Sequence, residues 1–291
     1  MKLKYHKHSE IDKHKWDETI QNSDSPFIYA MSWYLDIVSP KWNAIISEDY
    51  EYVMPICKKL KFGLIPIITQ PVLCQQLGIF SSKKGIINEN IIQLFLKNIP
   101  FYYLKKTIQF NFNHQKTTPF LERKNYTLNC EISYLDIEKK YSSQTRRNLK
   151  KAKKNNLTIE QTSATCAIEN FKNWKLKNST IDKKDFESVS NTLKKIEEKE
   201  YTLSLKVMLQ NVELASCVLY KHNKTLTLVL ISSSPKGLKL GATTFLLNHI
   251  FKTNSSKSII FDFEGSNITG IERFYKGFGA VKQTYYLYQK P

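Results

Sequence analysis

Apolar residues follow two spacings in the first half of the chain, and each predicts a different kind of element. Three segments repeat apolar residues every three to four positions, as one face of an α-helix does; they are Glu10–Asn22, Tyr29–Val38 and Ile87–Lys97. Three others are short and rich in β-branched or aromatic residues, which is typical of strands; they are Trp42–Ser47, Glu51–Leu60 and Thr107–Phe112. The first two strands flank a polar turn and predict a hairpin.

The pattern restarts near Tyr141 with a basic helix and then becomes more regular. It predicts strand, two helices, three strands, helix, strand, short helix and strand, with polar turns between the three consecutive strands. The expected segments are Leu157–Glu160, Phe171–Lys177, Phe186–Glu198, Tyr201–Leu209, Glu213–Lys221, Leu226–Ser232, Gly241–Lys252, Ile259–Phe263, Thr269–Tyr275 and Ala280–Gln289. The restart, together with a length of 291 residues, predicts two domains, 1–138 and 139–291.

The net charge of +18 adds a preference for anionic partners, although its origin has two readings. Lysine supplies 40 of the 44 basic residues, which an AT-rich genome would also produce. Arginine is scarce and suits phosphate, so its positions are more informative. Three of the four arginines, Arg146, Arg147 and Arg273, fall in the two segments with candidate chemistry.

The chain lacks the sequence motifs that are typical of several classes of protein. The five scattered cysteines and six histidines form no C-x-x-C or H-E-x-x-H pattern, so neither a disulfide nor a metal site is expected. The G-x-S-x-G and G-x-x-x-x-G-K-[ST] motifs are absent, which argues against hydrolases and NTPases. No segment has the length and composition of a membrane span or signal peptide, so we expect a cytoplasmic protein.

The segment Lys236–Ala242 is the strongest local signal. It lies between the predicted strand ending at Ser232 and the helix beginning at Gly241, and it contains Gly237 and Gly241. Backbone N–H groups at a helix start bind phosphate where neighbouring side chains are small. An ordinary strand-to-helix turn is the alternative reading.

The residues that follow carry a resemblance to a known superfamily. The chain resembles the acetyl-CoA-dependent N-acetyltransferases (GNAT) in the succession of its motifs. These are a pyrophosphate loop of the type K/R-G-x-x-x-G-A, a strand, an N-x-x-A/G helix and a terminal Gly-Phe. The stretch Asp262–Ser266, the pair Gly270–Ile271 and the stretch Phe274–Gly279 resemble the motif of the FemABX-like branch, bacterial proteins with two such domains. The resemblance implies two tandem GNAT-like domains of the α/β (α+β) class, each a mixed, mostly antiparallel sheet flanked by helices. The first domain would have lost donor binding.

A basic helix supports the same branch. Ser142–Lys154 resembles the S-x-x-R-R-N-x-x-K-A helix of FemABX-like proteins. Arg146 and Arg147 are candidates to hold an anionic acceptor or phosphates, because Arg binds such groups through two hydrogen bonds. A solvated basic face is the alternative. Trp33 and Gln75 in the first half are further candidates for acceptor binding, or else core and turn residues.

The resemblance also implies residues for donor binding and catalysis. The expected donor-binding residues are Ile231, Ser232, Ser233, Lys236, Gly237, Leu238, Lys239, Gly241, Ala242, Thr243 and Asn267. Tyr275 is the candidate acid, although the GNAT spacing gives Phe274 and the FemABX pattern has Lys where Tyr275 stands. Asp262 and Glu264 are candidate bases, with Asp262 alternatively capping the next loop.

These expectations combine into three alternatives. The first is an N-acyltransferase that uses acetyl-CoA or a longer acyl-CoA, with no metal, to acylate a small-molecule or peptide amine in a cleft between the domains. The second is a FemABX-type peptidyltransferase that uses aminoacyl-tRNA on a cell-envelope precursor. The third is a noncatalytic binding protein on the same fold.

Overall fold

The computed structural model describes residues 1–175, 183–265 and 268–290 and divides into two compact units. Unit 1 comprises Met1–Arg123 and the C-terminal segment Thr284–Pro291, and unit 2 comprises Lys124–Gln283. The sequence had placed the boundary at residue 138 and the whole C-terminus in the second domain. The difference arises from a strand at 121–129 that starts unit 2 and a last strand that leaves it.

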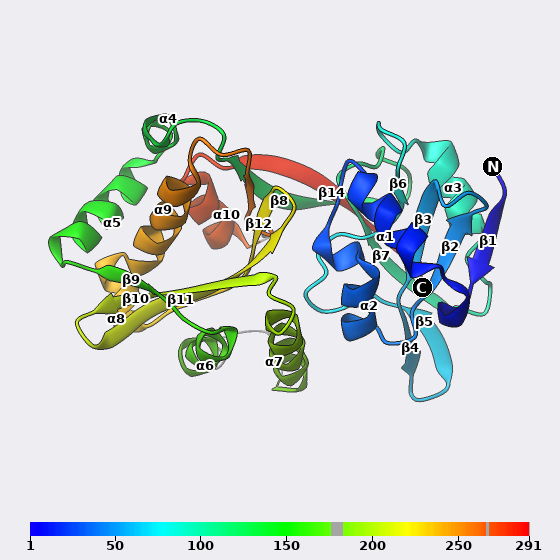
Figure 1. Ribbon diagram of the computed structural model, residues 1–291, viewed down its shortest axis with the longest axis horizontal. Helices are drawn as coiled ribbons and strands as arrows, with labels where there is room; N and C mark the ends of the chain where they lie inside the picture. Colours follow the sequence, from blue (N-terminus) through cyan, green and yellow to red (C-terminus); the bar gives the residue numbers. More distant parts are fainter. Residues whose placement is uncertain (176–182, 266–267, 291) are drawn as a thin grey trace. The chain divides into compact units, whose positions relative to one another are not determined.

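Unit 1 contains two small sheets and three α-helices within its described residues. Its elements are β1 (Leu3–His6), α1 (Lys13–Asn22), α2 (Ser32–Val38), β2 (Asn43–Ser47), β3 (Tyr52–Ile56), β4 (Lys58–Lys61), β5 (Ile65–Ile68), β6 (Phe80–Ser81), α3 (Glu89–Lys97) and β7 (Lys105–Phe110). One sheet has the order β1-β2-β3-β6. In the other, the order is β4-β5-β7 followed by the end of β14 (Val281–Lys290). Figure 1 labels these elements.

The helices of unit 1 begin at the polar caps that the sequence provides. Asp12 accepts hydrogen bonds from the first backbone N–H groups of α1, and Asn88 does the same for α3. Behind α1, the rings of Trp16 and Trp42 pack with centroids 4.6 Å apart. The Trp16 indole donates to the Ala30 carbonyl at 2.8 Å, so this buried aromatic pair is also satisfied in its hydrogen bonding.

Unit 2 is built on one larger sheet. Its elements are β8 (Leu121–Asn129), α4 (Tyr134–Lys139), α5 (Ser143–Lys154), β9 (Thr158–Gln161), α6 (Ala164–Trp174), α7 (Lys183–Glu197), β10 (Thr202–Leu209), β11 (Val212–His222), β12 (Thr225–Ser233), α8 (Pro235–Leu240), α9 (Ala242–Asn254), β13 (Ile260–Asp262), α10 (Thr269–Lys276) and the start of β14. The strand order is β14-β8-β13-β12-β11-β10-β9. The pairs from β8 to β9 are antiparallel except for the parallel pair β12–β13.

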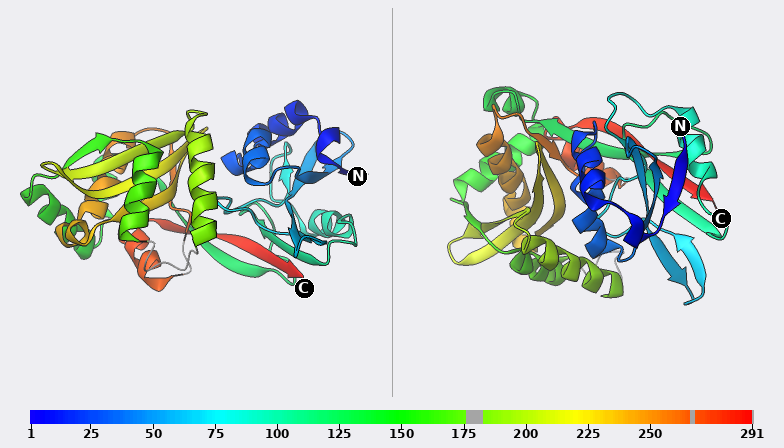
Figure 2. Two further views of the ribbon diagram at one scale, coloured as in Figure 1. Left: turned by 90° about the horizontal axis from the view of Figure 1, so that it is seen from below. Right: turned by 45° about the vertical axis from the view of Figure 1, so that its right-hand side comes forward.

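Helices cover both faces of this sheet. Helices α5 and α9 pack together, and α9 lies on β10, β11 and β12, while α6 and α7 lie on the opposite face (Figure 1). Seen from below, α6 and α7 cross the strands in green and yellow-green (Figure 2). The core beneath α9 is a cluster of aromatic rings, in which Phe251 meets Phe261 edge to face at 5.0 Å.

The predicted mixed α/β class is therefore confirmed, and most predicted elements are present. The structure corrects two expectations. Residues 121–129 and 134–139 form β8 and α4, which the pattern did not indicate. The expected open loop at 236–242 is largely a helix, α8. Among the described helices, none combines the length and apolar character needed to cross a bilayer.

Candidate functional site

One edge of strand β12 loses its partner a third of the way along the strand. β12 pairs with β11 over its whole length, but with β13 only at Thr225–Thr227. Within the described part of the chain, no strand pairs with residues 228–233 on that second edge. A β-bulge lies at the same place, because Leu228 and Leu230 oppose adjacent residues of β11 and leave Val229 extra. This edge offers backbone N–H and C=O groups to a ligand.

A buried carboxyl lies where β13 ends. Asp262 is 3% exposed and is the register partner of Thr227, the last residue of β12 that pairs with β13. Burial raises the pKa of the Asp262 carboxyl to about 6. Two hydrogen bonds act in the opposite direction and lower this pKa: one from the Glu264 N–H, which donates to Oδ1 at 2.7 Å, and one from the Asn125 side chain. A carboxyl with this pKa is ionised at neutral pH yet readily protonated, which suits a general base.

Asn125 connects this carboxyl to the last strand. Its side chain is fully buried on β8, and its amide donates to Gln283 Oε1 at 3.3 Å. Within the described chain the Asn125 Oδ1 has no hydrogen-bond partner. An unsatisfied buried acceptor is uncommon and marks a polar spot in the interior of unit 2. Asn125 could not be anticipated, because the sequence pattern does not predict β8.

Tyr275 lies close to these carboxylates. It is buried on α10, with its ring packed on Phe263 at 4.5 Å. Burial raises the pKa of the Tyr275 phenol, and the charges of Glu264 and Asp262 raise it further. The phenol is therefore a weak acid, better suited to donating a hydrogen bond than a proton. The structure thus brings together Asp262, Glu264 and Tyr275, the three expected catalytic residues.

Glu272 on α10 is a further charged residue that the sequence did not single out. Its carboxylate accepts from three side chains: Lys124 at 2.8 Å, Tyr126 at 2.7 Å and Lys276 at 2.6 Å. These hydrogen bonds lower the pKa of Glu272 to about 2. The group fastens α10 to β8. Only its spacing to Lys276, four residues on, could have suggested a role.

The segment expected to cradle phosphate has a different structure. Ser234 caps α8 and accepts the Gly237 N–H at 3.0 Å, and Pro235 occupies the first helical position. A side chain at Gly237 would meet the Leu214 carbonyl oxygen. Gly241 has a φ of +76°, and a Cβ there would lie 2.5 Å from the Asn148 carbonyl oxygen of α5. Close packing therefore accounts for both glycines.

The other expected donor-binding residues are distributed around α8. Lys236, Leu238 and Lys239 are exposed, and the Lys239 carbonyl accepts from Lys151 Nζ at 3.0 Å. Ala242 is fully buried, and the Thr243 Oγ1 is a buried hydroxyl without a partner among the described residues. Asn267 lies outside the described residues.

The expected residues at the end of β12 are mostly occupied by internal contacts. Ile231 is half-buried and packs against the core. The buried Ser233 hydroxyl donates to the Leu214 carbonyl at 2.9 Å, and Ser232 Oγ lies 3.4 Å from Ser216 Oγ. Backbone groups, rather than these hydroxyls, remain the candidates for contact with a donor.

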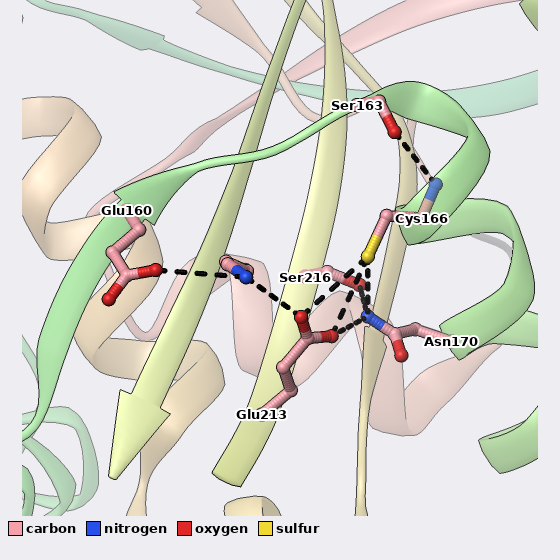
Figure 3. A network of polar contacts seen from close by, with 7 residues as sticks. Glu160, Ser163, Cys166, Asn170, Glu213 and Ser216 are labelled. Atoms are coloured by element: carbon pink, nitrogen blue, oxygen red, sulfur yellow. Dashed lines mark hydrogen bonds and ion pairs between the residues drawn. The ribbon is translucent and has the colours of Figure 1, made fainter. Parts of the chain in front are cut away.

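Ser216 belongs to a polar network that the sequence did not predict (Figure 3). At its centre, Glu213 accepts from Asn170 Nδ2 at 2.7 Å and from Lys206 Nζ at 2.9 Å. Asn170 Nδ2 also reaches Ser216 Oγ at 3.2 Å, and the Cys166 thiol faces Glu213 at 3.7 Å. The network joins α6 to β10 and β11 across the sheet face opposite α9.

The two arginines of α5 have different surroundings. Arg146 donates to the carbonyls of Tyr141 and Lys139, at 3.0 and 2.9 Å, and so fixes the segment that follows α4. Arg147 lines a cavity of about 620 Å³ between the first turns of α5 and helix α10. Arg273 and Lys276 line the same cavity, which makes it a candidate site for an anion.

The acceptor-binding candidates of the first half both lie in unit 1. Trp33 is half-buried on α2, with its ring edge to face with Tyr34 at 5.6 Å. Gln75 accepts from Gln76 Nε2 at 2.9 Å. Their role in binding stays a prediction. Elsewhere, no cluster of three or more His, Cys, Asp or Glu residues suited to a metal ion occurs in 1–175, 183–265 or 268–290.

The chain is similar to known proteins in its structure but not in its sequence. No family model and no curated protein matches the sequence. Solved structures do match over nearly the whole chain. FemX matches with a TM-score of 0.65 at 10% identity, covering 98% of this chain and 97% of FemX.

Two other solved structures also match nearly the whole chain at low sequence identity. A tandem GNAT protein from the clavulanic acid biosynthesis pathway has a TM-score of 0.56 at 8% identity, with 100% of this chain and 99% of that chain covered. L-PGS from Bacillus licheniformis has a TM-score of 0.54 at 11% identity, with 95% and 90% covered. The protein therefore has the tandem GNAT-like fold of the FemABX-like proteins.

Proposed function

We propose that the protein is an N-acyltransferase, which moves an acyl group from acetyl-CoA or a longer acyl-CoA to the amine of a small molecule or peptide. The observation that supports this most is the unpaired edge of β12 from Leu228 to Ser233, beginning beside the buried carboxyl of Asp262. We place the reaction in the cytoplasm.

The donor would lie along this edge. The pantetheine arm of CoA carries amide groups, and an extended chain with amides can hydrogen bond to a free strand edge as another strand would. The exposed Lys236 and Lys239 would approach its phosphates. The bulge at Val229 turns the backbone of β12, so an N–H near it would polarise the thioester carbonyl.

In this proposal Asp262 handles the proton. The amine nitrogen attacks the thioester carbon, the C–S bond breaks, and the sulfur leaves as a thiolate. Asp262 takes the proton that the nitrogen loses and returns it to the thiolate. Tyr275 donates a hydrogen bond within this site, since its raised pKa makes it a poor acid.

The test combines donor binding with turnover. Calorimetry of the purified protein with acetyl-CoA and with longer acyl-CoA should give a saturable signal. Asp262→Asn should keep donor binding but lose about 10²-fold or more in kcat, whereas Tyr275→Phe should lose about tenfold or less. If neither acyl-CoA binds, the proposal fails. If Tyr275→Phe loses more activity than Asp262→Asn, the two roles are exchanged.

One observation favours aminoacyl-tRNA as the donor instead. Helix α8 and its two packed glycines leave little of an open phosphate loop, while Arg147, Arg273 and Lys276 line a basic cavity. In a filter-binding assay, the protein should then retain aminoacylated tRNA better than uncharged tRNA, and this preference should not depend merely on low salt. Retention that is equal for charged and uncharged tRNA would reflect only the net charge of +18.

A further inference from the structure

Unit 1 exposes a group of large apolar side chains at one end of its second sheet. The turn between β4 and β5 carries Phe62 and Leu64, which are 81% and 84% exposed, and β4 carries the exposed Leu60. The segment before β7 adds Phe101 at 91% and Leu104 at 61%. The β4–β5 hairpin extends beyond the body of unit 1 (Figures 1 and 2). Single exposed apolar residues are common, but a group of them marks an interaction surface.

The pairing of the strands brings these two segments to one place. Leu60 is opposite Pro66 on β5, and Ile67 of β5 pairs with Lys105, the first residue of β7. Leu60, Pro66 and Tyr102 line a common cavity of about 690 Å³. We call the hairpin residues 58–66 and the segment 101–104 the apolar tip.

Lysines lie within the apolar tip and beside it. Lys7, Lys41, Lys58 and Lys59 line the same cavity, and among the described residues that line it none is Asp or Glu. Burial lowers the pKa of the Lys58 ammonium, and the charges of Lys41 and Lys7 lower it further, so these cations lie close enough to repel one another. An anion in the cavity would relieve that repulsion.

The cavity also has polar groups on its inner wall. The hydroxyls of Tyr5 and Tyr103 are 2.7 Å apart, and the Asn43 amide donates to Tyr5 at 2.5 Å. Asn43 and Tyr103 are almost fully buried. Cations, hydroxyls and exposed apolar side chains thus occur together in and beside one cavity, which suits a layer that has anionic groups above hydrocarbon.

We propose that unit 1 binds the surface of a bilayer that contains anionic lipids. The exposed side chains of Phe62, Leu64 and Phe101 enter the boundary between headgroups and acyl chains, and the lysines bind lipid phosphates. The apolar tip lies wholly in unit 1, so this proposal is independent of the reaction proposed for unit 2.

Sedimentation of the full-length protein with vesicles tests the proposal. Vesicles of phosphatidylcholine and phosphatidylglycerol in equal parts should retain the protein, and vesicles of phosphatidylcholine alone should retain far less. The double change Phe62→Ser and Leu64→Ser should weaken binding about tenfold or more. Lys58→Glu with Lys59→Glu should weaken it by at least the roughly fivefold expected for each lysine.

Matched controls come from exposed residues of unit 2. Leu135→Ser on α4, where the leucine is 66% exposed, and Lys194→Glu with Lys195→Glu on α7 should leave vesicle binding unchanged. All variants alter exposed residues, and circular dichroism checks that they fold.

Four results would overturn the proposal. These are no retention on either vesicle, equal retention on both, equal losses in the variants and their controls, or complete release by millimolar glycerol phosphate. The last result would identify the cavity as a site for a free phosphate compound. Self-association that is abolished by Phe62→Ser and Leu64→Ser, without vesicle binding, would instead identify the tip as a contact between copies of the chain.

Discussion

Gly241, at the junction of α8 and α9, and Gly270, on α10, have different structural roles. Gly241 combines a left-handed φ of +76° with a backbone carbonyl where a side chain would begin. Gly270 on α10 has open space at the same point. A glycine-rich motif therefore contains positions that packing requires and positions that it does not.

Gly241→Ala should destabilise unit 2 by at least about 2 kcal/mol, because a left-handed alanine is strained and its Cβ meets the Asn148 carbonyl. Urea unfolding measures the loss. Gly270→Ala is the control and should be neutral or stabilising by up to about 1 kcal/mol, since alanine is the better helix former. Equal effects of the two substitutions would contradict the packing role.

The buried Asp262 predicts a pH dependence with a definite sign. Its carboxyl has a pKa of about 6 in the folded protein, against an ordinary 3.8, so the folded state holds this proton more tightly than the unfolded state. The tighter binding of this proton contributes about 3 kcal/mol to the free energy of unfolding below pH 4. This contribution is lost as the pH rises through 6.

Asp262→Asn abolishes that titration while keeping an acceptor for the Glu264 N–H. The unfolding free energy of the variant, relative to the unaltered protein, should therefore rise by about 3 kcal/mol between pH 4 and pH 7.5, as measured by hydrogen exchange of β11 amides. The exposed Asp136→Asn should show no such rise. A difference that stays constant with pH would place the pKa of Asp262 near its ordinary value.

At the scale of elements, the network around Glu213 holds helix α6 on the sheet. Glu213→Ala removes the acceptor shared by Asn170 and Lys206 and should cost about 1–3 kcal/mol. Hydrogen exchange should speed up in α6 more than in α9. Glu169→Ala, which removes an exposed ion pair with Lys172, should change stability by less than about 0.5 kcal/mol. Similar exchange in both variants would show that the network does not hold the helix.

The elements that the sequence predicted are those with a clear period. α5, the β10–β11–β12 meander and α9 all agree with expectation, because their apolar spacing is regular and their turns are short and polar. Strand β8 was missed because its sequence, LERKNYTLN, is polar, and its buried positions include Asn125.

Helix α8 was missed for a different reason. The stretch between the predicted strand ending at Ser232 and the predicted helix beginning at Gly241 resembles a loop, although Ser234 followed by Pro235 is also a helix start with a cap and a proline at the first position. The unpaired edge and the bulge at Val229 depend on strand register, which no single segment of sequence specifies. Asp262, Glu264 and Tyr275 could be anticipated because they lie in one short motif.

For the whole molecule, the division into units does not follow the order of the chain. Unit 1 takes its last strand from the C-terminus, where Tyr286–Lys290 pair with Lys106–Phe110 of β7. Tyr288 also packs on Phe120 at 5.6 Å. Removing 284–291 should therefore lower hydrogen-exchange protection in β7 while leaving β11 unchanged. Removing only Gln289–Pro291, which keeps Tyr288, should have a much smaller effect. Loss of protection in both units would show that they unfold together.

The returning strand also bears on how the protein is made. The ribosome synthesises 284–291 after all of unit 2, so residues 1–123 wait, with one edge of β7 unpaired, until that segment emerges. Residues 124–283 are complete earlier and are free to fold first, which reverses the usual N-to-C order of domain folding. During that interval the open edge of β7 is a template for pairing with other chains, so the newly made protein should depend on chaperones more than its size suggests.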